Sequence, residues 1–408
     1  MRHATAAFFA ASLTIAPLAA LADSDITVPD GFSVAVAHDG VGRARHIAVR
    51  DNGDLFVALT SGEIVALRDS DGDGSLETVE RRTAPVHTGL KIHNDYLYVS
   101  NDTEVNRVTL DDALMPQGDF ELIVGGMPAQ SSHTAAPLAF DTAGHLYVGS
   151  GAPSNACQDP QRVPGAAGQD PCPQLAEYGG IWRFDADTPG QTFTEDARYI
   201  TGMRQAVGLD WSPSADKLAF VMHGRDQLHS LWPDRFTVED NAQNPAEEFH
   251  VLSEGDNLGW PYSYWSPVKD ARMVAPEYGG NADSRSDNDA YKAPDYAFPA
   301  HWAPNDILFY EGDMFPASYK NGAFIAFHGS WNRAPEPQAG YRVMFLPMKG
   351  ATPGEAMTFA NGFAGTGVIE SPGDARFRPM GLATAPDGSL YIADSKEGRI
   401  WRISYDGA

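Results

Sequence analysis

Two features are scarce in this sequence of 408 residues: basic side chains and long apolar runs. Only 29 lysines and arginines face 54 aspartates and glutamates, which gives a net charge of −25. A field of that sign repels phosphate backbones, so nucleic acid is not expected as a partner. Beyond the first segment there is no uninterrupted apolar run of about 18 residues, so the mature chain is predicted to be soluble, without a membrane span.

The first 22 residues have the pattern of an export signal. A basic start precedes an apolar, alanine-rich stretch that ends in the small-x-small pattern Ala20-Leu21-Ala22. Residues 1–22 are therefore predicted to be a cleaved signal peptide, and residues 23–408 to form the mature periplasmic protein. A short buried N-terminal helix is the alternative interpretation.

Cysteine is also scarce, with one residue at 157 and one at 172. Both lie in a loop rich in proline, glycine and glutamine. In an oxidising periplasm Cys157 and Cys172 are expected to pair, and closing so short a loop stabilises by about 3 kcal/mol. A metal site is the alternative, but the loop offers no recognisable spacing of histidine or aspartate partners.

One sequence pattern recurs along the chain: small or apolar residues, a turn with glycine, then a short run of residues that favour β-strands. Copies begin at His46, Leu90, Leu138, Gly208 and Gly381, and a looser copy spans 315–326. Turns such as Asn52-Gly53 supply the positive φ angles that hairpins need. The first copies are spaced by roughly 40–50 residues, the size of a propeller blade. Because one such unit cannot bury both faces alone, the predicted fold class is all-β, a six-bladed β-propeller, with a pair of β-sandwiches as the alternative.

Several other patterns are absent. The chain shows no long amphipathic helical pattern, no glycine-rich phosphate loop after a strand, no Gly-x-Ser-x-Gly elbow and no His-Glu-x-x-His helix. The larger gaps between copies, residues 151–179 and 261–300, are predicted to be inserted loops on a rigid scaffold. Such loops are where binding sites are usually built.

The most specific local motif consists of acidic residues. Asp69, Asp71 and Asp73 alternate around Gly72 and Gly74, and Glu80 occupies the twelfth position counted from Asp69. Alternating carboxylates around a sharp turn place several hard oxygens at one point, as Ca²⁺ requires. The loop is predicted to bind a structural calcium ion, or else to be a solvated hairpin tip, since the helices of an EF-hand are missing.

Histidines and arginines recur at equivalent places in the repeat. Predicted strand ends or loops carry His133, His223, His301 and His328, and arginines near later copies are Arg204, Arg376 and Arg378. Equivalent ends of all blades converge on one face, so these side chains are expected to share a site. In a protein of such negative charge, the cluster indicates a small anionic ligand over the channel. Structural histidines and surface salt bridges are the alternatives.

Longer motifs resemble those of one family. They are Phe327-His-Gly-Ser-Trp-Asn-Arg333 with Gly340-Tyr-Arg-Val, Gly224-Arg-Asp-Gln-Leu-His229, Gly255-Asp-Asn-Leu-Gly-Trp-Pro261, Arg376-Phe-Arg-Pro-Met-Gly-Leu382, Gly151-Ala-Pro-Ser-Asn-Ala-Cys157 and Pro171-Cys172-Pro173. Over nearly all of the mature chain the sequence resembles L-sorbosone dehydrogenases and related pyranose dehydrogenases that depend on pyrroloquinoline quinone (PQQ). More distantly it is similar to soluble quinoprotein glucose and aldose sugar dehydrogenases.

The resemblance implies a role for each matching position. It makes His133 the general base and Arg204 the arginine that stabilises the reduced quinone, with Gln205 beside it where glucose dehydrogenases have asparagine. The main-chain carbonyls of Gly224 and Arg225 would bind the catalytic Ca²⁺. The positions that would hold the carboxylates of PQQ are His301, His328, Arg333, Arg376 and Arg378.

The implied activity is the oxidation of an aldose, pyranose or sorbosone-type sugar with PQQ and Ca²⁺ as cofactors. A periplasmic cytochrome c or a membrane quinone would suit as electron acceptor. Two other classes stay open at this point: a calcium-dependent sugar lactonase, and a propeller that binds a protein or glycan without catalysis. The sequence alone does not identify the sugar.

Overall fold

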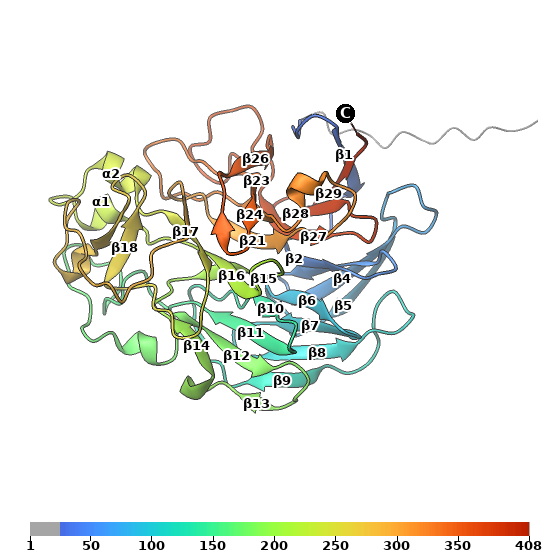
Figure 1. Ribbon diagram of the computed structural model, residues 1–408, viewed down its shortest axis with the longest axis horizontal. Coiled ribbons are helices and arrows are strands. Elements are labelled where there is room, and N and C mark those ends of the chain that lie inside the picture. Colours follow the sequence, from blue (N-terminus) through green and yellow to red (C-terminus); the bar gives the residue numbers. More distant parts are fainter. Residues whose placement is uncertain (1–24, 408) are drawn as a thin grey trace, which may run out of the picture.

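The computed structural model describes residues 25–407, so the predicted signal peptide lies outside the described residues. Strands dominate and arrange into a six-bladed β-propeller, which confirms the predicted fold class (Figure 1). Within the described part no helix is long and apolar enough to cross a membrane.

Five blades are built from strands that follow one another along the chain. Blade 1 holds β2 (Ala44–Val49), β3 (Leu55–Leu59), β4 (Glu63–Arg68) and β5 (Thr78–Thr83). Blade 2 holds β6 (Leu90–His93), β7 (Tyr96–Ser100), β8 (Val105–Thr109) and β9 (Glu121–Gly125), and gains β13 (Gln191–Thr192) at its edge. Blade 3 holds β10 (Leu138–Phe140), β11 (His145–Ser150), β12 (Gly180–Asp185) and β14 (Arg198–Thr201).

The remaining blades complete the ring. Blade 4 holds β15 (Ala206–Ser212), β16 (Lys217–Met222), β17 (Glu247–Val251) and β20 (Tyr296–Phe298). Blade 5 holds β21 (Pro304–Phe309), β22 (Ala323–Phe327), β23 (Arg342–Leu346) and β26 (Met357–Ala360). Blade 6 holds β27 (Pro379–Thr384), β28 (Leu390–Asp394) and β29 (Ile400–Tyr405), with β1 (Phe32–His38) paired antiparallel to β29.

The first strand of each blade faces the central channel. Each of these inner strands contacts the inner strands of the two neighbouring blades, so β2, β6, β10, β15, β21 and β27 form a closed ring. Six large apolar clusters lie one between each pair of successive blades. The cluster between blades 5 and 6, for example, buries Phe324, Phe345 and Trp401. Each blade therefore buries its two faces against its neighbours, as the repeat requires.

The hairpin copies read from the sequence match inner hairpins in five blades. In blade 5 the prediction of a copy over 315–326 was wrong at its start. The second strand, β22, lies there, but the first strand is β21, which begins at Pro304. A longer connection with a short 3-10 turn, Ala317–Tyr319, separates the two, so the usual tight-turn signal is missing.

Insertions gather outside the ring. Residues 151–179 follow β11 and contain the disulfide Cys157–Cys172, which confirms the predicted pairing. A second insertion carries the short helices α1 (Leu228–Leu231) and α2 (Val238–Gln243) and was not foreseen. The stretch 261–300, predicted as a loop, contains a small sheet of β18 (Ser263–Ser266) and β19 (Ala271–Val274), and also β20 of blade 4. Figure 1 shows α1, α2 and β18 together at one side of the propeller.

A second small hairpin pairs β24 (Met348–Lys349) with β25 (Thr352–Pro353), in the connection between β23 and β26. It lies within blade 5 and contributes no residue to the cavities described below.

Candidate functional site

A cavity of about 320 Å³ lies at one end of the channel. Its walls are formed by the segments that precede the first strand of a blade and by those that follow the second strand. These two kinds of segment lie at the same end of the channel, because the first two strands of each blade are antiparallel. This central cavity is lined by polar and charged side chains that include His133, Arg204, Gln205, His223, Asp226, Glu247, His301, His328 and Arg378. The structure therefore brings together most of the histidines and arginines selected from the sequence.

His133 is held with one ring nitrogen bound and the other available. Its Nδ1 lies 2.6 Å from the carbonyl oxygen of Ala152. Nδ1 therefore carries the proton and donates a hydrogen bond to that oxygen. The backbone of His133 has a φ of 57°, and Gln130 Nε2 fixes it by donating to the carbonyls of His133 and Gly151. Burial, together with the nearby Arg204 guanidinium, lowers the pKa of His133 to about 3. The ring is thus neutral and its Nε2 is a proton acceptor.

Arg204 and Asp226 form the charged centre of the cavity. Arg204 Nη2 donates to Asp226 Oδ2 at 2.8 Å, and Arg162 Nη2 donates to the same oxygen at 2.9 Å. Asn332 Nδ2 donates to Asp226 Oδ1 at 2.5 Å. Burial alone would raise the pKa of Asp226, but the two guanidinium groups bring it below its usual range. Arg204 Nε is buried and has no acceptor among the described residues, so it can donate to a ligand.

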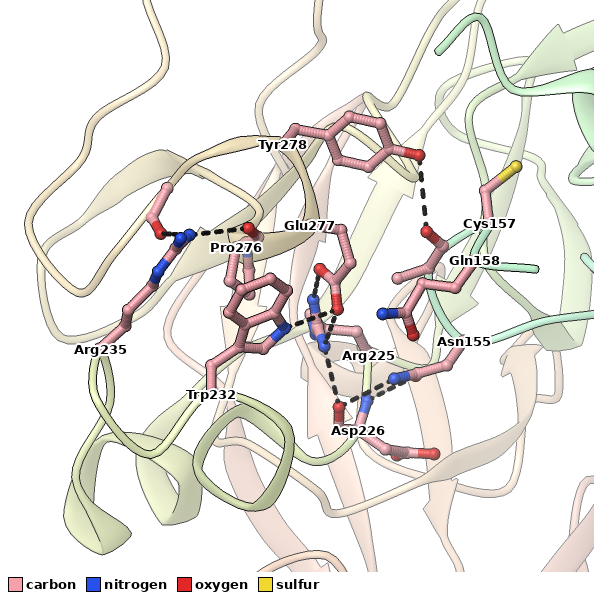
Figure 2. A network of polar contacts seen from close by, with 12 residues as sticks. Asn155, Cys157, Gln158, Arg225, Asp226, Trp232, Arg235, Pro276, Glu277 and Tyr278 are labelled. Atoms are coloured by element: carbon pink, nitrogen blue, oxygen red, sulfur yellow. Dashed lines mark hydrogen bonds and ion pairs between the residues drawn. The ribbon is translucent and has the colours of Figure 1, made fainter. Parts of the chain in front are cut away.

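The segment Gly224–Asp226 is anchored from behind by two insertions (Figure 2). The main chain of Asp226 exchanges hydrogen bonds with the side chain of Asn155, whose Nδ2 donates at 3.0 Å and whose Oδ1 accepts at 2.9 Å. The Arg225 side chain turns away from the cavity and forms a fully buried, two-pronged ion pair with Glu277. Trp232 Nε1 donates to the same carboxylate at 3.0 Å. The position of this segment is therefore fixed by residues remote in sequence.

Gly224 itself is required for close packing. A Cβ at this position would lie 2.6 Å from Pro245 and 2.8 Å from the carbonyl oxygen of Ala246. Among residues 25–407 no hydrogen bond reaches the main-chain carbonyl oxygens of Gly224 and Arg225. These two oxygens were predicted to bind calcium, and they are free to act as ligands.

Glu247, which the sequence reasoning missed, is the second carboxyl group of the cavity. It accepts hydrogen bonds from the main-chain N–H of Gly224 at 2.9 Å and of Ala303 at 3.0 Å. Burial outweighs these bonds and raises the pKa of Glu247 to about 7. The residue joins blade 4 to the segment that leads into blade 5.

Three further histidines lie around the cavity and are neutral; His301 is buried, and His223 and His328 are partly buried. His223 Nε2 lies 2.8 Å from the carbonyl of Pro304, and burial lowers its pKa to about 4. His301 Nε2 lies 2.7 Å from the carbonyl of Asn241, and its pKa is lowered by burial. His328 Nε2 lies 2.6 Å from Ser395 Oγ, and burial with the nearby Arg378 holds its pKa well below the usual value.

The predicted arginines divide into two groups. Arg378 lines the cavity and donates from Nε to the carbonyl of His328 at 3.0 Å. Arg376 does not line it, because its guanidinium pairs with Asp25 at the half-exposed surface. Arg333 also lies outside the cavity lining and donates to the carbonyls of Ala242 and Pro337. The structure thus does not bring Arg333 and Arg376 to the place that the sequence predicted for them.

The acidic loop brings together only part of the predicted set. Carboxylate oxygens of Asp69, Asp71 and Glu77 come within 4.8 Å of one another. Asp73 instead accepts from the N–H of Ser75, and Glu80 lies in β5, paired with Ala66. The structure therefore does not bring Glu80 to Asp69 and Asp71, because β5 begins at Thr78 and places Glu80 in its ladder.

Sequence reasoning also missed Arg45, Trp331 and Asn332. Arg45 lies in β2 of blade 1, directly before the repeat copy that begins at His46, and an arginine at this place belongs to no motif. Trp331 and Asn332 stand within the motif 327–333, but only its histidine and arginine were selected. Trp331 is 51% exposed, unusual for so large an apolar side chain, and it borders the central cavity.

Taken together, a closed six-bladed ring with a basic, histidine-lined cavity defines a propeller protein with a ligand site at the end of its channel. Comparison with known proteins gives the family. The sequence model of the TrAA12-like family matches residues 26–406. The chain therefore belongs to the TrAA12-like family.

Two curated proteins match half of this chain. An uncharacterized protein of Borreliella burgdorferi is 31% identical over 208 residues, which are 50% of this chain and 48% of that protein. The pyrroloquinoline quinone-dependent pyranose dehydrogenase of Coprinopsis cinerea is 27% identical over 230 residues, which are 50% of this chain and 30% of the dehydrogenase. The matches thus span less than half of the length of either relative.

Solved structures share the fold over nearly the whole chain. The PQQ domain of the Coprinopsis cinerea pyranose dehydrogenase superposes with a TM-score of 0.71 at 19% identity, covering 93% of this chain and 97% of that domain. A calcium structure of a family AA12 carbohydrate-active enzyme from Trichoderma reesei gives a TM-score of 0.75 at 19% identity, covering 96% and 100%. At this identity the likeness concerns the fold.

Proposed function

We propose that this protein is a sugar dehydrogenase that binds PQQ and Ca²⁺ in the central cavity. The observation that carries the proposal is the concentration of Arg45, Arg204 and Arg378 around one neutral, proton-accepting histidine, in a protein of net charge −25. The PQQ-dependent relative and the family membership support it.

The residues present fit both groups. A planar tricarboxylate needs several donors, and Arg204 Nε, buried without an acceptor among the described residues, can supply one. The free carbonyl oxygens of Gly224 and Arg225 are hard ligands suited to Ca²⁺. When bound, PQQ supplies a quinone that accepts hydride and Ca²⁺ supplies a Lewis acid.

Each of several residues of the protein then has a separate role in the proposed reaction. His133 Nε2 accepts the proton of the sugar hydroxyl, while the Nδ1 bond to Ala152 keeps the ring in the required tautomer. Arg204 places a positive charge beside the reacting centre, with its orientation fixed by Asp226. Arg378 and His328 would help to hold the carboxylates of the cofactor, and Gln205 would be a further donor in the cavity wall.

The arrangement is less suited to a lactonase. Such an enzyme needs carboxylate and amide oxygens that converge on a metal ion. Here both oxygens of Asp226 accept from Arg204, Arg162 and Asn332, and Glu247 accepts from two main-chain N–H groups. Both carboxylates of the cavity thus accept hydrogen bonds from groups of the protein itself.

The same proposal includes an aldose, pyranose or sorbosone-type sugar as substrate, and a cytochrome c or a quinone as electron acceptor. It also places the protein in the periplasm, which the disulfide and the predicted signal peptide support. N-terminal sequencing of the exported protein checks the location: a start near Asp23 supports it, and an intact Met1 contradicts it.

Reconstitution tests the activity. Purified protein freed of metal and cofactor is given PQQ and Ca²⁺, separately and together, and dye reduction is followed with a panel of sugars. We expect activity only with both additions. Absence of PQQ binding, or hydrolysis of sugar lactones without PQQ, would contradict the proposal.

Trp331 is proposed to pack against the apolar face of the sugar. Its loop is fixed, because Asn332 binds Asp226, and Ser330 Oγ donates to the carbonyl of His301 at 3.1 Å. Trp331→Ala is expected to raise KM for the sugar by about 3- to 10-fold, since an aromatic contact contributes about 0.5–1.5 kcal/mol. PQQ binding should be unchanged, and Trp331→Phe should retain most of the affinity. Equal KM values for the alanine variant and the wild type would contradict this role.

A further inference from the structure

A second cavity of about 320 Å³ lies beside the central one. Blade 1, blade 6 and the connection between β26 and β27 contribute most of its wall, with His328 from blade 5. We call it the outer basic cavity; its lining is Arg43, Ala44, Arg45, Thr60, His328, Pro372, Gly373, Arg378, Ser395 and Lys396. Arg45, His328 and Arg378 line both cavities, so the two are neighbours across these side chains.

The outer basic cavity has four permanent cations and, among the described residues, no carboxylate in its wall. Asp394 lies two residues before Lys396 but faces inward, accepting from the main-chain N–H groups of Arg378, Glu397 and Gly398. Lys396 Nζ donates to the main-chain carbonyls of Gly373 and Ala375. These two contacts are with neutral groups. Lys396 also helps to lower the pKa of Asp374, whose carboxylate does not line the cavity.

Arg45 has no ion pair among residues 25–407. Its guanidinium contacts only Thr88 Oγ1 at 3.4 Å and Met380 Sδ at 3.7 Å. Burial, Arg43 and Arg378 lower the pKa of Arg45 to about 10, which reflects the crowding of positive charge. The side chain of Arg43 is exposed and forms no hydrogen bond or ion pair among residues 25–407. In a strongly acidic protein, such a cluster concentrates anions at one point of the surface.

The ligand of this cavity is separate from the sugar. Of these two cavities, the central one alone is lined by His133, Arg204 and Gly224, and the outer one alone by Arg43 and Lys396. A molecule beside Arg43 and Lys396 would therefore be separated from His133, the proposed base, by side chains that line both cavities. We infer that the outer basic cavity binds an anionic one-electron acceptor.

This inference rests on the proposed dehydrogenase activity, and the electrons and protons of the reaction balance as follows. Oxidation of a sugar C–H and O–H to a carbonyl releases two electrons and two protons. Two acceptor molecules each take one electron, and the protons pass to solvent. Hexacyanoferrate(III) is a suitable probe, because it is a trivalent anion that is reduced by one electron. Hexacyanocobaltate(III) has the same charge and shape but is not reduced under these conditions.

The first experiment measures binding without turnover. Hexacyanocobaltate(III) is titrated calorimetrically into protein loaded with PQQ and Ca²⁺, at low ionic strength because salt screens exposed charges. The double variant Arg43→Ala/Lys396→Ala is expected to bind it about tenfold more weakly than the wild type, since two cations facing a trivalent anion are removed. Lys349→Ala, which removes an exposed cation of β24 outside both cavities, should bind like the wild type. Equal affinities in all three proteins would overturn the inference.

The second experiment compares acceptors during sugar oxidation. The double variant should have a KM for hexacyanoferrate(III) raised about tenfold, with an unchanged KM for the sugar. With the cationic acceptor hexaammineruthenium(III), it should not be slower than the wild type. Loss of rate with both acceptors would overturn the acceptor site. If the wild type oxidises sugar with the cationic acceptor but binds no hexacyanocobaltate(III), the inference fails and the proposed function stands. If the wild type oxidises no sugar with either acceptor, the proposed function fails, and with it the acceptor role of the cavity.

Discussion

Replacing His133 by alanine should lower kcat for sugar oxidation by a factor of about 10²–10⁴, the usual contribution of a general base. PQQ binding should persist, because Arg204, Arg378 and His328 remain in the cavity wall. The measurements are steady-state kinetics of the reconstituted enzyme and a spectroscopic titration with PQQ. Near-normal turnover, or loss of PQQ binding with normal folding, would contradict the assignment of His133 as the base.

Two further variants separate the base from its scaffold. His133→Asn keeps a side-chain N–H that can donate to the carbonyl of Ala152, but it offers no basic nitrogen, so it should be as inactive as the alanine variant. His145→Ala is the control, since His145 belongs to the same blade, pairs with Asp141 and lies outside the cavity. Its kcat should match that of the wild type.

The pH dependence follows from the same residue. A histidine whose pKa is lowered to about 3 is neutral, and therefore able to accept a proton, at every pH above roughly 4. The kcat profile should thus show no acidic limb from His133 between pH 5 and pH 8. A limb near pH 6.5 that disappears in His133→Asn would show that the ring titrates normally.

The largest stability effect is expected for Glu277→Ala. The substitution leaves the buried guanidinium of Arg225 without its carboxylate and removes the acceptor of Trp232 Nε1. Breaking a buried ion pair in this way costs about 3–5 kcal/mol, because an uncompensated charge stays in the interior. Urea unfolding followed by fluorescence should show the loss.

The matched control removes both charges. Arg225→Met combined with Glu277→Leu leaves no buried charge unpaired and should recover most of the lost stability. Because the main-chain carbonyl of Arg225 is one of the two proposed calcium ligands, Glu277→Ala should also weaken Ca²⁺ binding, as measured by calorimetry. If the single and double variants are equally stable, the ion pair does not hold this segment.

The sequence predicted the ring and the end of the channel where the site lies, because both depend on local signals. Hairpin turns such as Asn52-Gly53 identify the inner strands of five blades, and His133 and Arg204 stand just before two of them. Blade 5 was read with the wrong first strand, since its hairpin connection is long and lacks that turn chemistry. Residues 151–179 were recognised as an insertion, but their contact with Asp226 was not predictable.

The partners of the site residues depend on long-range contacts. Glu277 meets Arg225 across two insertions, and Glu247 approaches Ala303 only because blades 4 and 5 pack together. Arg376 and Arg378 are close in sequence, yet one pairs with Asp25 and the other lines both cavities. A motif therefore indicates which residues gather near a site, whereas the tertiary packing decides which of them face it.

The pairing of β1 with β29 has a consequence for how the molecule is made. Blade 6 takes one strand from near the start of the described chain and three from its end, as the blue β1 beside the red β29 shows in Figure 1. The apolar faces that blades 5 and 6 bury against each other cannot be covered until the final strand has been synthesised. Such distant pairing gives a high contact order and slow folding. We therefore expect the ring to close last, when β29 pairs with β1.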